Sequence, residues 1–339
     1  MARDPVLQTI IGDAAWLCHR YDPQYDAFQY RRVERSRHRT VPFLTDSCLG
    51  VEDAPATVAR TDAIPFVPSP GPLHFIFHSA FCASTMLTRA LDLEGSAMGL
   101  SEPVVLNDIV GWRRRGAEPR QSGSVLAAAL GQLARPWASG EAVVVKPSNV
   151  FNGLAAGALM LSPQSRGVLL TAPLPVFLAS VARKGLDCRL WVRELLEGLV
   201  EEGMVDLGFE PRDYFRQTDL QVAAVGWLAQ QMLFMRMIER FPERLVSLDS
   251  ERLTDDPAAS VAGVARFFGL GRSDEADYRD HPALSRDSKS GAAFGSGQRR
   301  RDREMAEQAH GDEIAKVVVW AKAVADNAGV PMTLPSALR

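Results

Sequence analysis

Small and hydroxyl-bearing residues fill a short turn between an apolar run at residues 74–78 and a helical pattern at residues 84–93. The turn reads SAFCAST over residues 79–85. Small side chains let a backbone approach a ligand closely, and the first N–H groups of a helix have no partner within that helix. Together with the helix macrodipole, those groups attract an anion. The segment predicts a turn that binds phosphate or sulfate. The alternative is an ordinary strand-to-helix turn with a serine N-cap.

The turn differs from the common loops that bind nucleotides or cleave phosphate. A Walker A loop requires G-x-x-x-x-G-K-[ST], and residues 79–85 contain neither glycine nor lysine. The three spaced glycines of a dinucleotide-binding fingerprint are also missing. Six residues separate Cys82 from Arg89, one more than the C-x5-R loop of cysteine phosphatases contains. The chain has no G-x-S-x-G elbow and no two histidines with metal-ligand spacing. We therefore expect neither a serine hydrolase nor a metal centre.

Short apolar runs alternate along the chain with longer segments of helical spacing. The runs are at residues 74–78, 142–145, 167–170 and 245–248. The helical segments are at residues 84–93, 124–133, 175–199 with a break near Gly185, 218–241, 257–268 and 312–328. This alternation predicts an α/β fold, a three-layer α/β/α arrangement around a mostly parallel central sheet. Ligands bind beyond the carboxyl ends of the strands in such sheets, so residues just after each apolar run are the site candidates.

The first 72 residues differ in pattern from the rest. We expect one or two helices around Trp16, a solvated basic face at residues 30–39, and a linker at residues 51–72 that ends in PSPGP. The chain is therefore divided into an N-terminal helical or loop extension, residues 1–72, and an α/β domain, residues 73–339.

Composition limits the functional class. The 339 residues are 46% hydrophobic and 23% charged, which is typical of a globular protein. A net charge of −3 disfavours a protein that coats nucleic acid or an anionic membrane. Four cysteines without CxxC spacing indicate reduced thiols, and we expect a cytoplasmic protein with no signal peptide and no membrane span.

Five segments between residues 74 and 268 resemble, in order, motifs of the sulfotransferases that use 3′-phosphoadenosine 5′-phosphosulfate (PAPS). Residues 82–85 (CAST) are similar to the end of the [KR]-S-G-[ST]-T loop, and residues 100–103 (LSEP) to an L-x-E-P segment. Residues 145–149 (VKPSN) resemble a K-P-x strand end. Residues 169–185 resemble the R-x-P-x-x-V-x-x-S segment, and residues 248–270 the E-x-L-x-x-D-P…F-L-G-L segment. The chain looks like a divergent bacterial-type member.

This resemblance implies a P-loop-type, sulfotransferase-like fold and transfer of a sulfuryl group from PAPS to a hydroxyl or amine acceptor, without a metal. Lys146 would neutralise charge that develops during transfer, and Glu102 or His78 would be the base. The donor would be bound by Ser79, Cys82, Ala83, Ser84, Thr85, Ser180 and Lys289. The expected partner is a small-molecule or a carbohydrate- or lipid-type hydroxyl acceptor, with no nucleic acid.

Two family arginines or lysines are replaced by apolar residues. Phe81 stands where a basic residue heads the first loop, and Ala172 where an arginine would bind the 3′-phosphate. Replacement cations would come from Lys146, Arg183, Lys184, or a basic loop at residues 288–303 that includes Lys289 and Arg299–Arg301. Two alternatives stay open: a catalytically inactive protein of this fold that binds a nucleotide or a protein, and a divergent P-loop kinase that requires ATP and magnesium.

Overall fold

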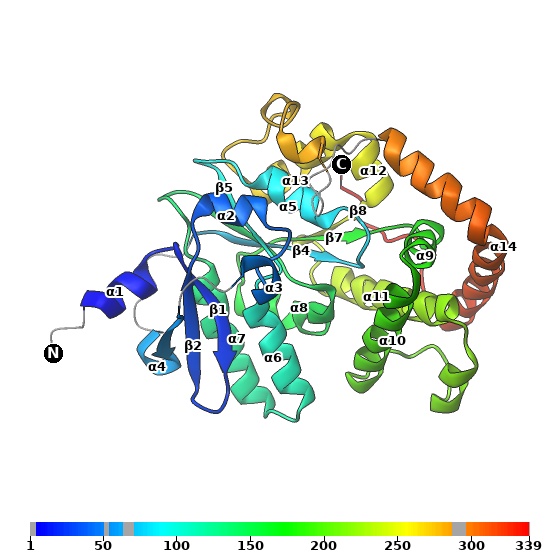
Figure 1. Cartoon of the computed structure of the whole chain (residues 1–339), viewed down its shortest axis with the longest axis horizontal. Coiled ribbons are helices and arrows are strands. Elements are labelled where there is room, and N and C mark those ends of the chain that lie inside the picture. Colours follow the sequence, from blue (N-terminus) through cyan, green and yellow to red (C-terminus); the bar gives the residue numbers. More distant parts are fainter. Residues whose placement is uncertain (1–4, 51–53, 64–70, 287–295, 339) are drawn as a thin grey trace.

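The computed structural model describes residues 5–50, 54–63, 71–286 and 296–338, with only the backbone at residues 296–300, 302 and 303. A five-stranded parallel sheet lies at the centre of this part of the chain (Figure 1). Its order is β5-β6-β4-β7-β8. The strands are β4 (Leu73–His78), β5 (Ala97–Ser101), β6 (Ala142–Lys146), β7 (Gly167–Thr171) and β8 (Leu245–Asp249).

Helices cover both faces of this sheet. Phe75 and Phe77 pack with one set of helices, and Ile76, between them, packs with the other, because successive strand residues point to opposite faces. One face carries α6 (Val104–Arg114), α7 (Pro119–Leu133) and α8 (Ala155–Leu161). The other carries α5 (Ser84–Leu91), α9 (Leu174–Arg183), α10 (Gly185–Glu201), α12 (Ser250–Asp255), α13 (Pro257–Phe268) and α14 (Ser296–Ala328). The predicted three-layer α/β/α class with a parallel sheet is confirmed.

The long helices follow the sequence pattern closely. The predicted break near Gly185 separates α9 from α10, and Gly185 has a φ of 72°. The almost wholly apolar helix α11 (Asp219–Arg240) contributes residues to the clusters on both faces. Helix α14 begins at Ser296, sixteen residues before the predicted start, so residues 296–303 of the expected basic loop are helical. The strong helix formers of that segment outweigh its flanking glycines. The remaining short helices are α1 (Pro5–Gly12), α2 (Arg35–Thr40), α3 (Asp46–Leu49) and α4 (Arg60–Ala63), with 3₁₀ turns η2 (Asn149–Leu154), η3 (Pro211–Arg216), η4 (Glu275–Asp277) and η5 (Pro282–Leu284).

The predicted helices around Trp16 are wrong. Trp16 begins strand β1 (Trp16–Asp22), which forms an antiparallel sheet with β2 (Ala27–Arg32) and β3 (Ala56–Ala59). Aromatic residues favour strands, and Asp26, with a φ of 46°, closes the tight turn between β1 and β2. Phe28 and Tyr30 pack in the same apolar cluster as Phe75 of the central sheet. The division of the chain at residue 72 stays a prediction.

The basic segment at residues 30–39 is not simply a solvated face. The Arg35 guanidinium is buried, 3.0 Å from Asp92 and 2.8 Å from Glu141, and both carboxylates are buried as well. Arg39 makes a second ion pair with Asp92, at 3.0 Å. Buried charges of opposite sign stabilise one another only when they are held in contact. These contacts therefore fix α2 against the central α/β unit.

The sequence pattern did not reveal strand β5. Its residues, AMGLS, include two small side chains and lack the β-branched residues that mark the neighbouring strand β6. Gly99 is required here because a Cβ atom would lie 2.6 Å from the carbonyl oxygen of Thr88. Among the helices of the described residues, none combines the length and hydrophobicity needed to cross a bilayer.

Burial of His38 makes stability depend on pH. Loss of water lowers the pKa of His38 from 6.5 to about 4, against the opposing charge of Asp92 and with a small contribution from Arg35. Between those values the unfolded chain binds a proton that the folded chain does not, so the free energy of unfolding falls as the pH falls. Between pH 7 and pH 4.5 we expect the free energy of unfolding of His38→Phe to decrease by about 2–3 kcal/mol less than that of the wild type.

Urea denaturation at several pH values measures this effect. The substitution His310→Phe on α14 is the control for exchanging an imidazole for a phenyl ring at a less buried position. Parallel pH curves for the wild type and His38→Phe would show that His38 does not carry the effect.

Candidate functional site

A cavity of about 590 Å³ opens beyond the carboxyl ends of the central strands. It lies where ligands bind in open parallel sheets. Its lining comes from the segment that follows β4, from the ends of β5 and β6, from α9 and α10, and from Phe43 in the N-terminal segment. The cavity thus collects residues that are more than a hundred positions apart in the sequence. Two of the three predicted catalytic residues, His78 and Glu102, line it, whereas Lys146 does not.

The turn after β4 holds three non-glycine residues in the left-handed region. Ala80, Phe81 and Ala83 have φ values of 70°, 52° and 62°. Each such residue costs roughly 1 kcal/mol or more, and strain of this kind concentrates at ligand sites. Successive left-handed and right-handed residues turn backbone N–H groups toward a common concavity that suits an anion. Residues 80–85 are therefore a candidate anion cradle that contains no glycine, in which the N–H of Ala80 is already bonded to His78 Nδ1.

Helix α5 begins directly at this turn. Its N-cap is Ala83, in the left-handed conformation, and no side chain provides a capping hydrogen bond. The alternative of an ordinary serine N-cap is therefore wrong. Ser84 and Thr85 lie in the first turn of α5 and line the cavity, as the sequence predicts. The positive end of the α5 macrodipole and the cradle face the same space.

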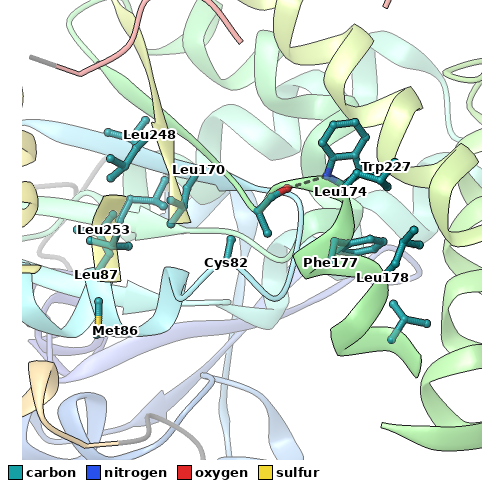
Figure 2. Packing of buried hydrophobic residues seen from close by; sticks show 14 of the residues in the cluster. Cys82, Met86, Leu87, Leu170, Leu174, Phe177, Leu178, Trp227, Leu248 and Leu253 are labelled. Atoms are coloured by element: carbon teal, nitrogen blue, oxygen red, sulfur yellow. Dashed lines mark hydrogen bonds between the residues drawn. The ribbon is translucent and has the colours of Figure 1, made fainter. Parts of the chain in front are cut away.

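Cys82 anchors the cradle from below. Its side chain is fully buried and packs in the apolar cluster with Leu87, Leu170 and Leu253 (Figure 2). Burial raises the pKa of the Cys82 thiol to about 11, so at neutral pH it is an uncharged, apolar group. Cys82 was predicted as a donor-binding residue, and only its backbone is suited to that role.

A second anchor lies on the β7 side of the cradle. The backbone N–H of Ala172 lies 3.4 Å from Ser79 Oγ, and its carbonyl oxygen accepts a hydrogen bond of 2.9 Å from the Trp227 indole (dashed line in Figure 2). Ala172 is fully buried. The position of a family arginine is therefore part of the core, and Ser79 helps to fix the cradle to it.

Lys146 ends strand β6 with a side chain that is fully buried (0% exposed). Its Nζ lies 2.5 Å from Glu102 Oε1 and 4.9 Å from the centre of the Phe43 ring. A lysine in such surroundings is stable only beside an opposite charge, and Glu102 supplies it. Two predicted catalytic residues thus form one ion pair at the cavity.

Glu102 is held in position by its backbone. It follows β5 with a φ of 50°, and its N–H donates to the carbonyl of Lys146 at 2.7 Å. The N-terminal segment flanks it, because the N–H of Leu44 donates to Ser101 and its carbonyl accepts from Val104. Sequence patterns do not show this role of residues 42–44, which set one wall of the cavity.

His78 links β4 to the neighbouring strand ends. Its Nε2 is 3.0 Å from the carbonyl oxygen of Pro147, and its Nδ1 accepts from the N–H of Ala80 at 3.1 Å. Together these bonds select the neutral tautomer with the proton on Nε2. Glu102 Oε1 lies 3.9 Å from Nε2. His78 therefore positions the cradle, while Glu102 retains a carboxylate that faces the cavity.

Helix α9 brings positive charge to the opposite side. Ser180, Arg183 and Lys184 line the cavity, and Ser180 Oγ donates to the carbonyl of Val176 in its own helix. The Lys184 ammonium lies 5.6 Å from the centre of the Phe81 ring. A cation at the end of α9 thus lies beside position 81, where the [KR]-S-G-[ST]-T loop that this turn resembles begins with a basic residue.

Lys289 is outside the described residues, as are the side chains of Arg299 and Arg300. Sequence reasoning missed Arg286, Trp191 and Asn149, all of which line the cavity. The position of Asn149 just after Lys146 in the VKPSN segment was a usable signal. Within the described residues, no group of three or more His, Cys, Asp and Glu could hold a metal ion.

No family model matches the chain, and no curated protein matches it in sequence. Among solved structures, the sulfotransferase domain from the curacin biosynthetic pathway is similar, with 13% identity and a TM-score of 0.42 over 78% of this chain and 99% of that domain. The sulfotransferase domain of the Synechococcus PCC 7002 olefin synthase has 15% identity and a TM-score of 0.35 over 80% and 93%. Both TM-scores are below 0.5, so neither likeness identifies a function for this chain.

The Lys146–Glu102 pair is expected to couple strongly in stability. Removing either partner leaves the other charge buried, so Lys146→Met and Glu102→Gln should each lower the free energy of unfolding by about 3 kcal/mol. The double variant should lose less than the sum, by about 1 kcal/mol or more. Guanidinium denaturation of the four proteins at pH 7 measures this coupling.

An exposed pair on α14 provides the matched control. Lys316 and Asp312 are 2.7 Å apart with side chains 74% and 85% exposed. The cycle of Lys316→Met and Asp312→Asn should give a coupling of only about 0.3–0.5 kcal/mol. Equal coupling in the two cycles would contradict a special role of burial at Lys146.

Proposed function

We propose that the protein is a sulfotransferase-like enzyme that transfers a sulfuryl group from PAPS to a hydroxyl or amine acceptor. The observation that carries this proposal is that the 80–85 cradle and Glu102 line one cavity, with Lys146 buried behind Glu102 at 2.5 Å. Sulfuryl transfer requires an anion cradle, a cation where charge develops, and a base for the acceptor proton. Each of these groups has a candidate in or directly behind the cavity wall, and the five motifs in the sequence support the same reaction.

Each group of residues would have a separate role in the transfer. The cradle and the start of α5 would hold the phosphosulfate end of the donor by backbone N–H groups. The Glu102 carboxylate would accept the proton of the acceptor hydroxyl as its oxygen attacks sulfur. The bond between sulfur and the bridging oxygen breaks, and 3′,5′-phosphoadenosine leaves. Lys146 would stabilise the charge that develops on that oxygen.

Positive charge for the donor would come from α9 in place of the first loop. Phe81 packs against Phe177 and Trp191 and cannot neutralise a phosphate. Lys184 lies over the Phe81 ring, so its ammonium is close to the space that the missing basic side chain would occupy. Charge-assisted hydrogen bonds to phosphate are the strong ones, so this substitution is central to donor affinity.

A second candidate is a protein of the same fold that binds a nucleotide without catalysis. The observation in its favour is the apolar environment of both altered positions. Phe81 belongs to an aromatic cluster, and Ala172 is fully buried with its carbonyl bonded to Trp227. Under this candidate the cavity would still bind the nucleotide, but PAPS would not be turned over.

Calorimetric titration with 3′,5′-phosphoadenosine, in parallel with ATP and magnesium, tests the proposed function. We expect micromolar binding of 3′,5′-phosphoadenosine and much weaker binding of ATP–magnesium, because the turn lacks the Walker lysine and glycines. Binding of ATP–magnesium alone would favour a kinase. Binding of neither nucleotide would remove the proposed function.

The role of Lys184 as the replacement cation can be tested by removing its charge and placing a lysine at position 81. Lys184→Ala should weaken binding of 3′,5′-phosphoadenosine about tenfold, since one charge-assisted contact is lost. Adding Phe81→Lys to that variant should restore most of the affinity. The control is Lys322→Ala, which removes an exposed lysine of α14 outside the cavity lining. If Lys184→Ala and Lys322→Ala bind the nucleotide equally well, Lys184 is not the replacement cation.

A further inference from the structure

The order of the strands divides the cavity into two sides. Strand β4, which leads into the cradle, lies between β6 and β7. On the β7 side lie Arg183, the last residue of α9, and Lys184, its C-cap. On the β6 side Glu102 and Asn149 line the cavity, and Lys146 is buried behind Glu102. A PAPS molecule that lies across the cradle would therefore have one end near the cations at the end of α9 and the other end near Asn149.

Asn149 has an unused hydrogen-bond donor on the β6 side. Its side chain lines the cavity and the residue is only 4% exposed. Among the described residues, none is a hydrogen-bond partner for Asn149 Nδ2. A buried amide donor without a partner is destabilising, and such groups are rare in folded proteins. Asn149 lines the cavity while its Nδ2 is buried, so a ligand that reaches this amide could supply the missing acceptor.

A neighbouring asparagine shows the structural alternative. Asn152 lies in the same 3₁₀ turn, η2, and its Nδ2 donates to the carbonyl of His78 and to Gln230 Oε1, both at 3.0 Å. Asn152 thus ties η2 to β4 and α11 and has no capacity left for a ligand at that atom. The two amides differ in role because only Asn149 has its donor left over at the cavity.

The surroundings indicate which chemistry would satisfy Asn149. The nearest charged pair along the chain is Lys146 with Glu102, and the backbone N–H groups of the cradle lie across the same cavity. An amide adds a directed donor without adding charge. This combination suits an oxygen of a tetrahedral oxyanion better than it suits a cation or an apolar group.

We propose that Asn149 Nδ2 donates a hydrogen bond to an oxygen of the group that is transferred, which is the terminal tetrahedral group of the substrate molecule that donates it. The identification of that group as a sulfuryl group rests on the proposed function. Asn149 is then a binding residue for the transferred group, separate from the base Glu102 and from the nucleotide-binding side of the cavity.

Titration calorimetry with three probes tests this role in Asn149→Leu. Inorganic pyrophosphate, without magnesium, mimics the phosphosulfate end and tests the oxyanion contact alone. PAPS contains the terminal group, and 3′,5′-phosphoadenosine lacks it. Loss of one neutral hydrogen bond should raise the Kd of pyrophosphate and of PAPS about five- to tenfold, with the Kd of 3′,5′-phosphoadenosine unchanged. Asn327→Leu, at an exposed position of α14, is the control.

Thermal unfolding separates a ligand-binding amide from a structural one. Asn149→Leu removes a buried donor that has no partner, so its Tm should equal or exceed that of the wild type. Asn152→Leu breaks two hydrogen bonds and should lower the Tm by about 5 °C. The shorter variant Asn149→Ser, which cannot reach the ligand, should show the same loss of pyrophosphate affinity and guards against a packing defect of leucine.

The outcomes distinguish the inference from the proposed function. Unchanged pyrophosphate affinity in both Asn149 variants, no pyrophosphate binding by the wild type, or a Tm of Asn149→Leu as low as that of Asn152→Leu would each overturn the role of Asn149. Failure of the wild type to bind 3′,5′-phosphoadenosine and PAPS, with pyrophosphate binding still dependent on Asn149, would support the oxyanion site and remove the sulfotransferase function.

Discussion

The burial of one positive charge constrains the whole site. Lys146 is fully buried at the end of a central strand, and its ammonium requires a partner that is equally well fixed. Glu102 meets that requirement with a left-handed backbone and a hydrogen bond to the carbonyl of Lys146. The N-terminal segment then holds the chain on both sides of Glu102. In this way a short ion pair connects the end of β6, the end of β5 and the first fifty residues.

The buried Arg35 cluster extends this connection. Arg35 bridges Asp92, which follows α5, and Glu141, which precedes β6. The N-terminal segment is therefore fixed to the sheet at two places, by charge at Arg35 and by backbone hydrogen bonds at Leu44. Phe43 lies between these two attachment points, and its ring centre is 4.9 Å from the Lys146 ammonium. The part of the cavity lining that Phe43 forms is therefore fixed on both sides.

The cradle depends on the core beneath it. Three strained residues persist because their neighbours are tightly packed: Cys82 is fully buried, and Ser79 contacts Ala172, which Trp227 holds in turn. Glycine would adopt the same backbone at a lower conformational energy but with more freedom to lose on folding. Alanine and phenylalanine in these positions give a turn whose form is set by packing. Under the proposed function, the backbone N–H groups of the turn would thus be positioned before the sulfuryl donor binds.

The sequence by itself determined the layered α/β class, the approximate bounds of helices α5, α9, α10, α11 and α13, four of the five central strands, and residues 79–85 and 146 as site candidates. Those features depend on local periodicity and on residues adjacent in the chain, which a sequence displays directly. Tertiary structure decided the rest. The contacts of Lys146 with Glu102, Lys184 with Phe81, and Arg35 with Asp92 join residues 44, 103 and 57 positions apart. Strand β5 and the hairpin at Trp16 depend on packing partners elsewhere in the chain. A buried charge or an unused amide becomes visible only when distant segments surround it, because burial is a property of the folded neighbourhood and not of the residue.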